Sequence, residues 1–242
     1  MICFLCADLY CLLYSFSFSP QIATHYWLGL FVLGIVQGRC GWLMHEGGHY
    51  SLTGVIWLDR QLQMFLYGYG CGMSASFWRN QHNKHHATPQ KLKHDVDLDT
   101  LPLVAFHKSI AAKAEKSPVL KAWLKLQGAL FAPFSTFLVV LGWQAILHPR
   151  HALRTKNVVE LGWMAMRYVT WTLLFRSLGV SAAIAAYCVY THTASVYIFT
   201  NFAVSHTHKP VTEPEDRLDW VRYSANHTTN CTPSWWCNWW MA

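Results

Sequence analysis

The residues most able to do chemistry in this sequence are its histidines, which number 14 in 242 residues. Five of them form two short motifs, His45-x3-His49 and His82-x2-His85-His86. A helix turns about 100° per residue, so His45 and His49 lie about 40° apart, and the second motif falls within an arc of about 100°. Each motif therefore places its imidazoles on one helix face, where they could bind the same metal ion.

Imidazole groups gathered in this way suit transition metals such as iron, zinc, copper and nickel. The eight cysteines show no spacing typical of a zinc finger or an iron–sulfur site, and we interpret them as reduced thiols, mostly buried. Five imidazoles exceed the ligands of one four-coordinate zinc, so two metal ions are more natural. One H-x3-H motif alone could be two exposed helix-end histidines, but the two motifs together favour a metal site.

The elements that must position these histidines are apolar. Apolar residues make up 53% of the chain and charged residues 13%, against about 25% charged in a soluble domain. This composition excludes a disordered, a collagen-like and a nucleic-acid-binding chain. It predicts an all-α protein with about four membrane-spanning helices. The net charge of +7 is expected to gather on the cytosolic face, and the histidine cluster with it.

The apolar stretches run over 1–18, 26–44, 62–77, 119–147, 158–175 and 182–204. A spanning helix needs about 20 residues, so we predict spans at 1–18, 26–44, 158–175 and 182–204. The glycine-rich stretch 62–77 is a poor spanning helix and is expected to be interfacial or re-entrant. Glu160 and Arg167 interrupt the stretch 158–175.

The remaining stretch, 119–147, must not cross if the two motifs and His206 are to share one side of the membrane. An even number of crossings is needed between His86 and His206. We expect Pro133 to break the helix in this stretch, which leaves 158–175 and 182–204 as the two crossings. The basic residues that follow the stretch then lie in the cytosol.

The motifs and their flanks resemble a known family. The segments are GWLMHEGGH at 41–49, NQHNKHHA at 80–87, HDVDLDTLPL at 94–103 and FAVSHTHKP at 202–210. They are similar to the histidine boxes and adjoining sequence of membrane fatty-acyl desaturases, in particular the front-end, Δ6-type branch. The likeness covers nearly the whole chain.

The resemblance implies an oxygen-dependent enzyme of polyunsaturated fatty acid synthesis, which places a double bond between an existing one and the carboxyl end. It implies two iron ions and electrons from cytochrome b5. The substrate would be a fatty-acyl-CoA or an acyl-phospholipid, with no nucleic acid partner, in the endoplasmic reticulum membrane. The implied metal ligands are His45, His49, His82, His85, His86 and His206. His208 is a weaker candidate, and His227 is expected to have a plain polar role.

Two expected family features are missing from the sequence. The third box, Gln-x-x-His-His, should follow the tryptophan-rich run near Ala242, and a cytochrome b5-like domain with a His-Pro-Gly-Gly motif should lie at the N-terminal side. We therefore expect residues 1–242 to be a partial fatty acid desaturase domain, truncated at both ends and inactive alone.

Other interpretations stay open from the residues themselves. Membrane lipid hydroxylases and sterol oxidases share the two motif spacings, although the flanking match favours desaturation. A metal transporter would hold its histidines inside spans, whereas these lie past span ends. Four carboxylates near the motifs either orient histidines or are ordinary surface charges: Glu46, Asp95, Asp97 and Asp99.

Overall fold

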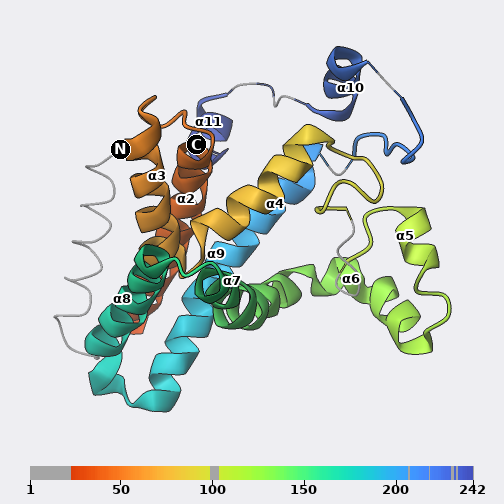
Figure 1. Cartoon of the computed structure of the whole chain (residues 1–242). Coiled ribbons are helices and arrows are strands. Elements are labelled where there is room, and N and C mark those ends of the chain that lie inside the picture. The colour runs from red at the N-terminus through yellow and green to blue at the C-terminus, as the bar shows by residue number, and fades with distance from the viewer. Residues whose placement is uncertain are drawn as a thin grey trace. The chain divides into compact units, whose positions relative to one another are not determined.

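A computed structural model describes residues 23–98, 104–206, 208–217, 219–229, 232 and 234–241 (Figure 1). In these residues the regular structure is helical apart from one isolated bridge between Lys91 and Thr212, which confirms the predicted all-α class. The predicted span at 1–18 lies outside the described residues. The helices are α2 Ala23–Gly48, α3 Ile56–Phe65, η1 Leu66–Gly70, α4 Ala75–Ala87, α5 Lys108–Ala112, α6 Pro118–Phe137, η2 Leu138–Leu147, α7 His148–Arg154, α8 Val158–Phe175, η3 Arg176–Leu178, α9 Val180–His206, α10 Trp220–His227 and α11 Trp235–Met241.

The chain divides into two compact units. The first comprises Met1–Phe77 and Ser135–Ile198, and so contains α2, α3, η1, η2, α7, α8, η3 and most of α9. The second comprises Trp78–Phe134 and Phe199–Ala242, with most of α4, most of α6, the helices α5, α10 and α11, and the last turns of α9.

In the first unit, α2 packs closely against α9 through the G-x-x-x-G motif of Gly34 and Gly38. A Cβ atom on Gly34 would lie 2.5 Å from the Cβ of Thr193, and one on Gly38 would overlap the ring of Tyr197. Small residues at this spacing let two apolar helix backbones approach each other, which is the usual basis of helix pairing in membranes. The two glycines therefore determine how closely α2 and α9 can pack.

Helices α8 and α9 form an antiparallel hairpin, joined by η3 and by Gly179 at φ 78° (Figure 1). The Trp171 and Phe175 rings are stacked with centroids 3.7 Å apart, and Trp171 also stacks on Tyr190 of α9 at 4.9 Å. Phe175 and Tyr190 are almost wholly buried, together with Leu30 of α2. This aromatic core holds α2, α8 and α9 together as one bundle.

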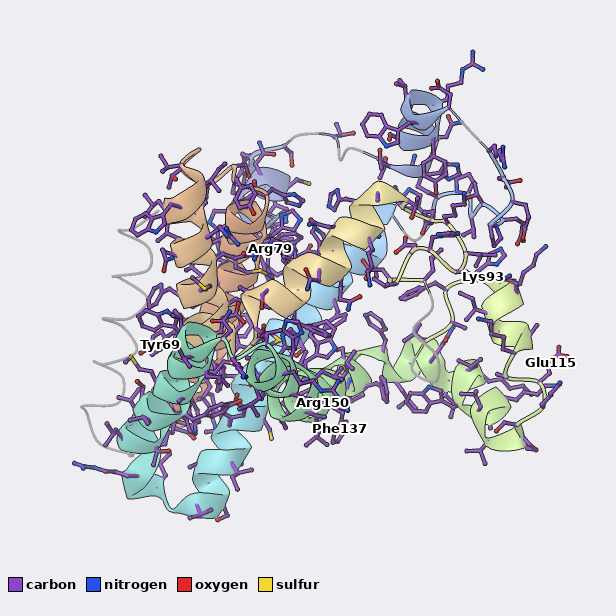
Figure 2. All side chains as sticks on the ribbon, viewed as in Figure 1. Tyr69, Arg79, Lys93, Glu115, Phe137 and Arg150 are labelled. Atoms are coloured by element: carbon purple, nitrogen blue, oxygen red, sulfur yellow. The ribbon has the colours of Figure 1, made fainter. Side chains whose placement is uncertain are left out.

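The predicted break at Pro133 is wrong. Pro133 lies inside α6, and the helical course continues through the π-helix η2 and α7 to Arg154, past the exposed Phe137 at the end of α6 (Figure 2). A proline removes one backbone hydrogen bond, and helices in an apolar environment tolerate this loss. The apolar residues on both sides outweigh the local penalty.

Three described helical stretches are long and apolar enough to cross a membrane: Tyr26–Gly48, Pro118–Arg154 and Val180–Ala203. The first and third overlap the predicted spans at 26–44 and 182–204, but the first continues past His45 to Gly48. The second is the stretch that we expected not to cross, and α8 is not among the three because Glu160 and Arg167 lower its hydropathy. Length and composition alone thus select Pro118–Arg154 as a crossing, where the prediction selects 158–175.

Candidate metal centre

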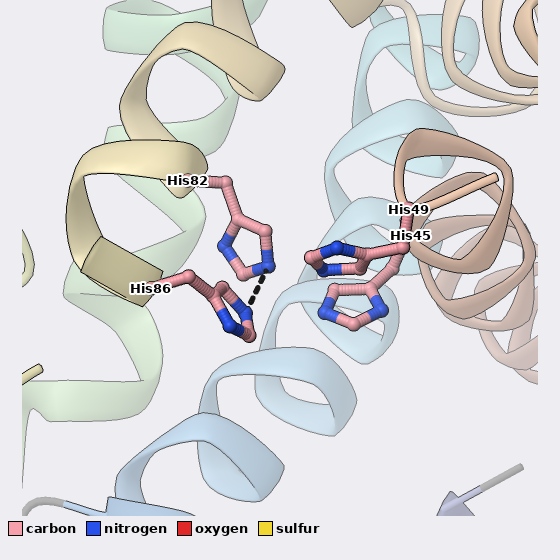
Figure 3. A group of neighbouring side chains, drawn as sticks. All are labelled: His45, His49, His82 and His86. Carbon is pink, nitrogen blue, oxygen red and sulfur yellow. Dashed lines mark hydrogen bonds between the residues drawn. The ribbon is translucent and has the colours of Figure 1, made fainter. Parts of the chain in front are cut away.

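The first histidine motif lies at the carboxyl end of α2, where the helix gives way to a turn. The His45 and His49 rings are neighbours, with centroids 4.6 Å apart at 64°, as the four-residue spacing predicts (Figure 3). Gly47 lies against α3, because a Cβ there would come within 3.1 Å of the Asp59 carbonyl oxygen and 3.3 Å of the Gln63 Cβ. The glycine inside the motif therefore lets α3 pack against the end of α2.

A carboxylate holds the first ring of this motif. His45 Nδ1 donates to Glu46 Oε1 at 2.9 Å, and Ser51 Oγ donates to Glu46 Oε2 at 2.8 Å. Because a carboxylate can only accept, the proton of a neutral His45 ring lies on Nδ1. Nε2 is then the atom of this ring that would bind a metal ion, as in many metal sites backed by a carboxylate.

The surroundings of the second ring, His49, favour its neutral form. Burial lowers the pKa of His49, and a positive charge on His45 lowers it further, while Glu46 acts in the opposite direction. A neutral imidazole is the form that binds a metal ion. The first motif thus places two imidazoles that could bind a metal on adjacent turns.

The second motif lies near the end of α4. The Nε2 atoms of His82 and His86 are 2.9 Å apart, so two possible donor atoms converge (Figure 3). Trp78 stacks on the His82 ring with centroids 4.1 Å apart and fixes its plane. A close pair of nitrogens shares a proton without a metal, and an ion placed there would replace that proton.

His85 is held differently from the other two rings of its motif. It is buried, and its Nδ1 donates to Asp95 Oδ1 at 2.9 Å, with Asp97 Oδ2 at 3.4 Å. Burial by itself lowers the pKa of His85, but the hydrogen bond to Asp95 and the charges of both carboxylates outweigh it and raise the pKa above its ordinary value. A metal on Nε2 would therefore compete with a proton that the two carboxylates stabilise.

The loop after α4 is built around Asp95, which is 1% exposed. Its carboxylate also accepts from the backbone N–H of Gln90 at 2.7 Å and of Asp97 at 2.9 Å. The interpretation of Asp95 as a surface charge is therefore wrong, whereas Asp97 is half exposed. The run of alternating acids does not reveal that Asp95 is buried, because Asp97 belongs to the same run and is half exposed. Asp99 lies outside the described residues.

Within the second unit, the segment that follows α9 contacts the loop that follows α4. Lys91 and Thr212 form the isolated bridge, and the hydroxyl of Tyr223 on α10 donates to the Pro89 carbonyl. His227 is buried, and its Nδ1 donates to the Pro210 carbonyl at 2.6 Å. This contact agrees with a plain polar role for His227.

Two candidate histidines remain, His206 at the end of α9 and His208 just after it. The helix ends at His206, whose side chain lies outside the described residues, and His208 is exposed in the turn that follows.

The donor set fits a transition metal on the chemistry of its atoms. Each motif contains a pair of neighbouring imidazoles, and each contains one ring whose Nδ1 is engaged by a carboxylate, which directs Nε2 outward. Imidazole nitrogen is a ligand for iron as well as for zinc and copper. The six predicted ligands remain predictions.

Comparisons with known proteins point in one direction. A family model described as fatty acid desaturase matches residues 23–242. An acyl-lipid (8-3)-desaturase of Rebecca salina is 64% identical over 214 residues, covering 88% of this chain and 50% of that protein. A protein of the same name from Thraustochytrium sp is 50% identical over 236 residues, covering 95% and 54%.

More distant similarity extends to a Δ6 fatty-acid desaturase (fat-3) of Caenorhabditis elegans, 31% identical over 127 residues that cover 52% of this chain and 28% of that protein. No solved structure matches the chain significantly. The chain spans about half the length of the two curated (8-3)-desaturases that it matches.

Proposed function

Because the chain belongs to the fatty acid desaturase family, we propose that it forms the iron-binding part of an oxygen-dependent acyl-lipid desaturase in a membrane. The double bond would lie between an existing double bond and the carboxyl end. The observation that carries the proposal is the pair of histidine motifs, each with two adjacent imidazoles and one ring backed by a carboxylate.

The names of the similar proteins refine the substrate. Two relatives at 64% and 50% identity are acyl-lipid (8-3)-desaturases, whereas the Δ6 relative is 31% identical over about half of the chain. We therefore propose an acyl chain carried on a lipid rather than on CoA, and 8-3 rather than Δ6 regiochemistry. A membrane-embedded enzyme meets such a substrate in its own bilayer.

Six histidines would hold the irons: His45, His49, His82, His85, His86 and His206. When bound, two irons would activate O2, which with two electrons from a donor is the oxidant that an unactivated methylene pair requires and that no side-chain acid or base can replace. Glu46 and Asp95 accept from Nδ1 of His45 and His85, so Nε2 would be the atom of each ring that binds a metal. The apolar helices exclude water from the acyl chain.

Electrons are proposed to come from cytochrome b5 in the endoplasmic reticulum membrane. The chain carries a net charge of +7, and a basic cytosolic surface attracts an acidic donor. This attraction weakens as salt screens it.

The function is tested by expressing the chain in yeast membranes, alone and joined to the downstream part of the Rebecca salina relative. We expect a new desaturated fatty acid by gas chromatography only from the joined form, because the resemblance places further ligands in a downstream Gln-x-x-His-His box. A product from the chain alone would contradict the need for that box.

In the joined form, His85→Ala should abolish the product and reduce bound iron, because no neighbouring group replaces a buried imidazole. His151→Ala is the matched control, since His151 lies outside both motifs, and it should retain product and iron. Normal iron and activity in the His85 variant would show that the ligand set is wrong.

A further inference from the structure

The helical course of the first unit is interrupted just before the helix that carries the second histidine motif. Residues 72–74 separate η1 from α4, with Gly72 at φ 73°, and Met73 and Ser74 are buried. Such a break leaves carbonyl groups at the end of one helix and N–H groups at the start of the next without intrahelical partners. In an apolar environment the protein must satisfy these groups itself.

The carbonyl groups before the break are satisfied by side chains from two other helices. Arg167 of α8 donates through Nη1 to the carbonyls of Tyr69 at 3.1 Å and of Gly70. Gln144 of η2 donates through Nε2 to the Cys71 carbonyl at 2.7 Å. A guanidinium group thus meets the negative end of a helix dipole, which is the favourable arrangement.

The N–H groups after the break are satisfied by an anion and a neutral imidazole. Glu160 of α8, 1% exposed, accepts through Oε1 from the Ser76 N–H at 2.8 Å and through Oε2 from the hydroxyls of Ser74 and Ser76. His148 Nδ1 accepts from the Ser74 N–H at 2.9 Å. The Ser74 hydroxyl in turn accepts from the Phe77 N–H at 3.2 Å, as an N-cap does. A carboxylate therefore meets the positive end of α4.

Both charged side chains come from one face of α8, because seven residues are close to two helical turns. We propose that Glu160 and Arg167 are positioning residues that clamp the two helix ends and so set the position and rotation of α4. The second motif begins about two turns after the clamped residues on the same helix. The inference rests on the proposed function only in taking His82, His85 and His86 as metal ligands.

The clamp explains why two charged residues, Glu160 and Arg167, interrupt the apolar segment of α8. Each is matched to the helix end that it contacts, an anion to N–H groups and a cation to carbonyls. Exchanging the two residues would reverse both matches while leaving the net charge of α8 unchanged. This distinguishes a clamp from a pair of charges that merely balance each other.

The first test is hydrogen exchange by mass spectrometry on the purified chain in detergent. Glu160→Ala should speed exchange at least tenfold in peptides covering residues 74–86 and change α9 peptides less than twofold. Met166→Ala, a substitution at an exposed position of α8, is the control and should change neither. No change in α4, or a change spread over all helices, would overturn the clamp.

The second test measures the affinity of the same proteins for Co²⁺ by its visible absorption. Glu160→Ala should weaken binding at least tenfold, and Glu160→Gln should recover most of it, because its amide oxygen still accepts from Ser76. The exchanged double variant, Glu160→Arg with Arg167→Glu, should stay weak. Wild-type affinity in the double variant would overturn the proposal.

A fallback variant and one further outcome separate a failure of the clamp from a failure of the proposed metal binding. If Glu160→Ala is not monodisperse, Ser74→Ala removes the cap hydroxyl and is expected to give the same local exchange and the same direction of change in affinity. If the unaltered chain binds no Co²⁺, the proposed metal function fails, while the exchange result still decides the clamp by itself.

Discussion

At the scale of single residues, the two motifs share a device: one histidine in each has Nδ1 held by a carboxylate, His45 by Glu46 and His85 by Asp95. The two carboxylates differ in burial. Glu46 has a side chain that is 50% exposed, whereas Asp95 is buried and also accepts two backbone N–H groups. Asp95 should therefore hold its ring more firmly.

This difference predicts the effect of substituting the carboxylate at the second motif. Asp95→Ala should lower metal affinity about 10- to 100-fold, the usual effect of removing a group that orients a ligand. Asp97→Asn should have a small effect, because Asp97 is half exposed and lies 3.4 Å from the ring. Titration of both proteins with Co²⁺ gives the comparison, and equal losses would show that Asp95 has no special role.

At the scale of elements, the packing of α2 on α9 depends on two glycines, and α8 joins them through its aromatic residues. The packing of α2 on α9 can be tested by substitutions that leave every histidine unchanged. Gly38 faces the ring of Tyr197, while Gly162 on α8 has no atom within 4 Å of where its Cβ would lie. The same substitution at the two positions thus separates packing from helix propensity.

Gly38→Ala should lower the free energy of unfolding by about 1–3 kcal/mol, the typical cost of overpacking. Gly162→Ala should be neutral or raise it by up to about 1 kcal/mol, because alanine favours helix over glycine. Thermal unfolding in one detergent provides the measurement. A destabilised Gly162 variant, or an unaffected Gly38 variant, would contradict the proposed role of the G-x-x-x-G motif.

At the scale of the whole molecule, two assignments of the membrane-crossing segments compete. Hydropathy selects Pro118–Arg154 and Val180–Ala203 after the second motif, and the prediction from the sequence selects 158–175 and 182–204. Both give the two crossings that a shared metal site needs. Because the charges of α8 are satisfied inside the first unit and α8 packs along α9, we keep α8 as a crossing helix.

Cysteine labelling separates the two assignments. In a background without native cysteines, Thr155→Cys should be labelled from the cytosolic side and Leu178→Cys from the opposite side. Thr155 and Leu178 are both exposed. If hydropathy alone decided the crossings, both cysteines would be labelled from the side opposite the histidine motifs, and the assignment of α8 would be wrong.

The sequence by itself determined what depends on neighbours along the chain. Helix periodicity placed His45 beside His49 and His82 beside His86, because residues four apart share a face in any helix. Apolar composition gave the helical class. The expectation that Pro133 breaks its helix failed, because the local penalty of proline is smaller than the preference of an apolar segment for internal hydrogen bonds.

Only the tertiary structure decided the contacts between residues far apart in sequence. Glu160 reaches Ser74 from a different helix, and the loop that carries Asp95 pairs through Lys91 with Thr212 in the segment after α9. No spacing rule identifies such partners, because their approach depends on how whole helices and loops pack. Glu160 is buried against donors from a different helix, whereas Asp95 is buried against the ring of His85 and the backbone N–H groups of its own loop. The sequence pattern around each carboxylate shows only an acidic residue.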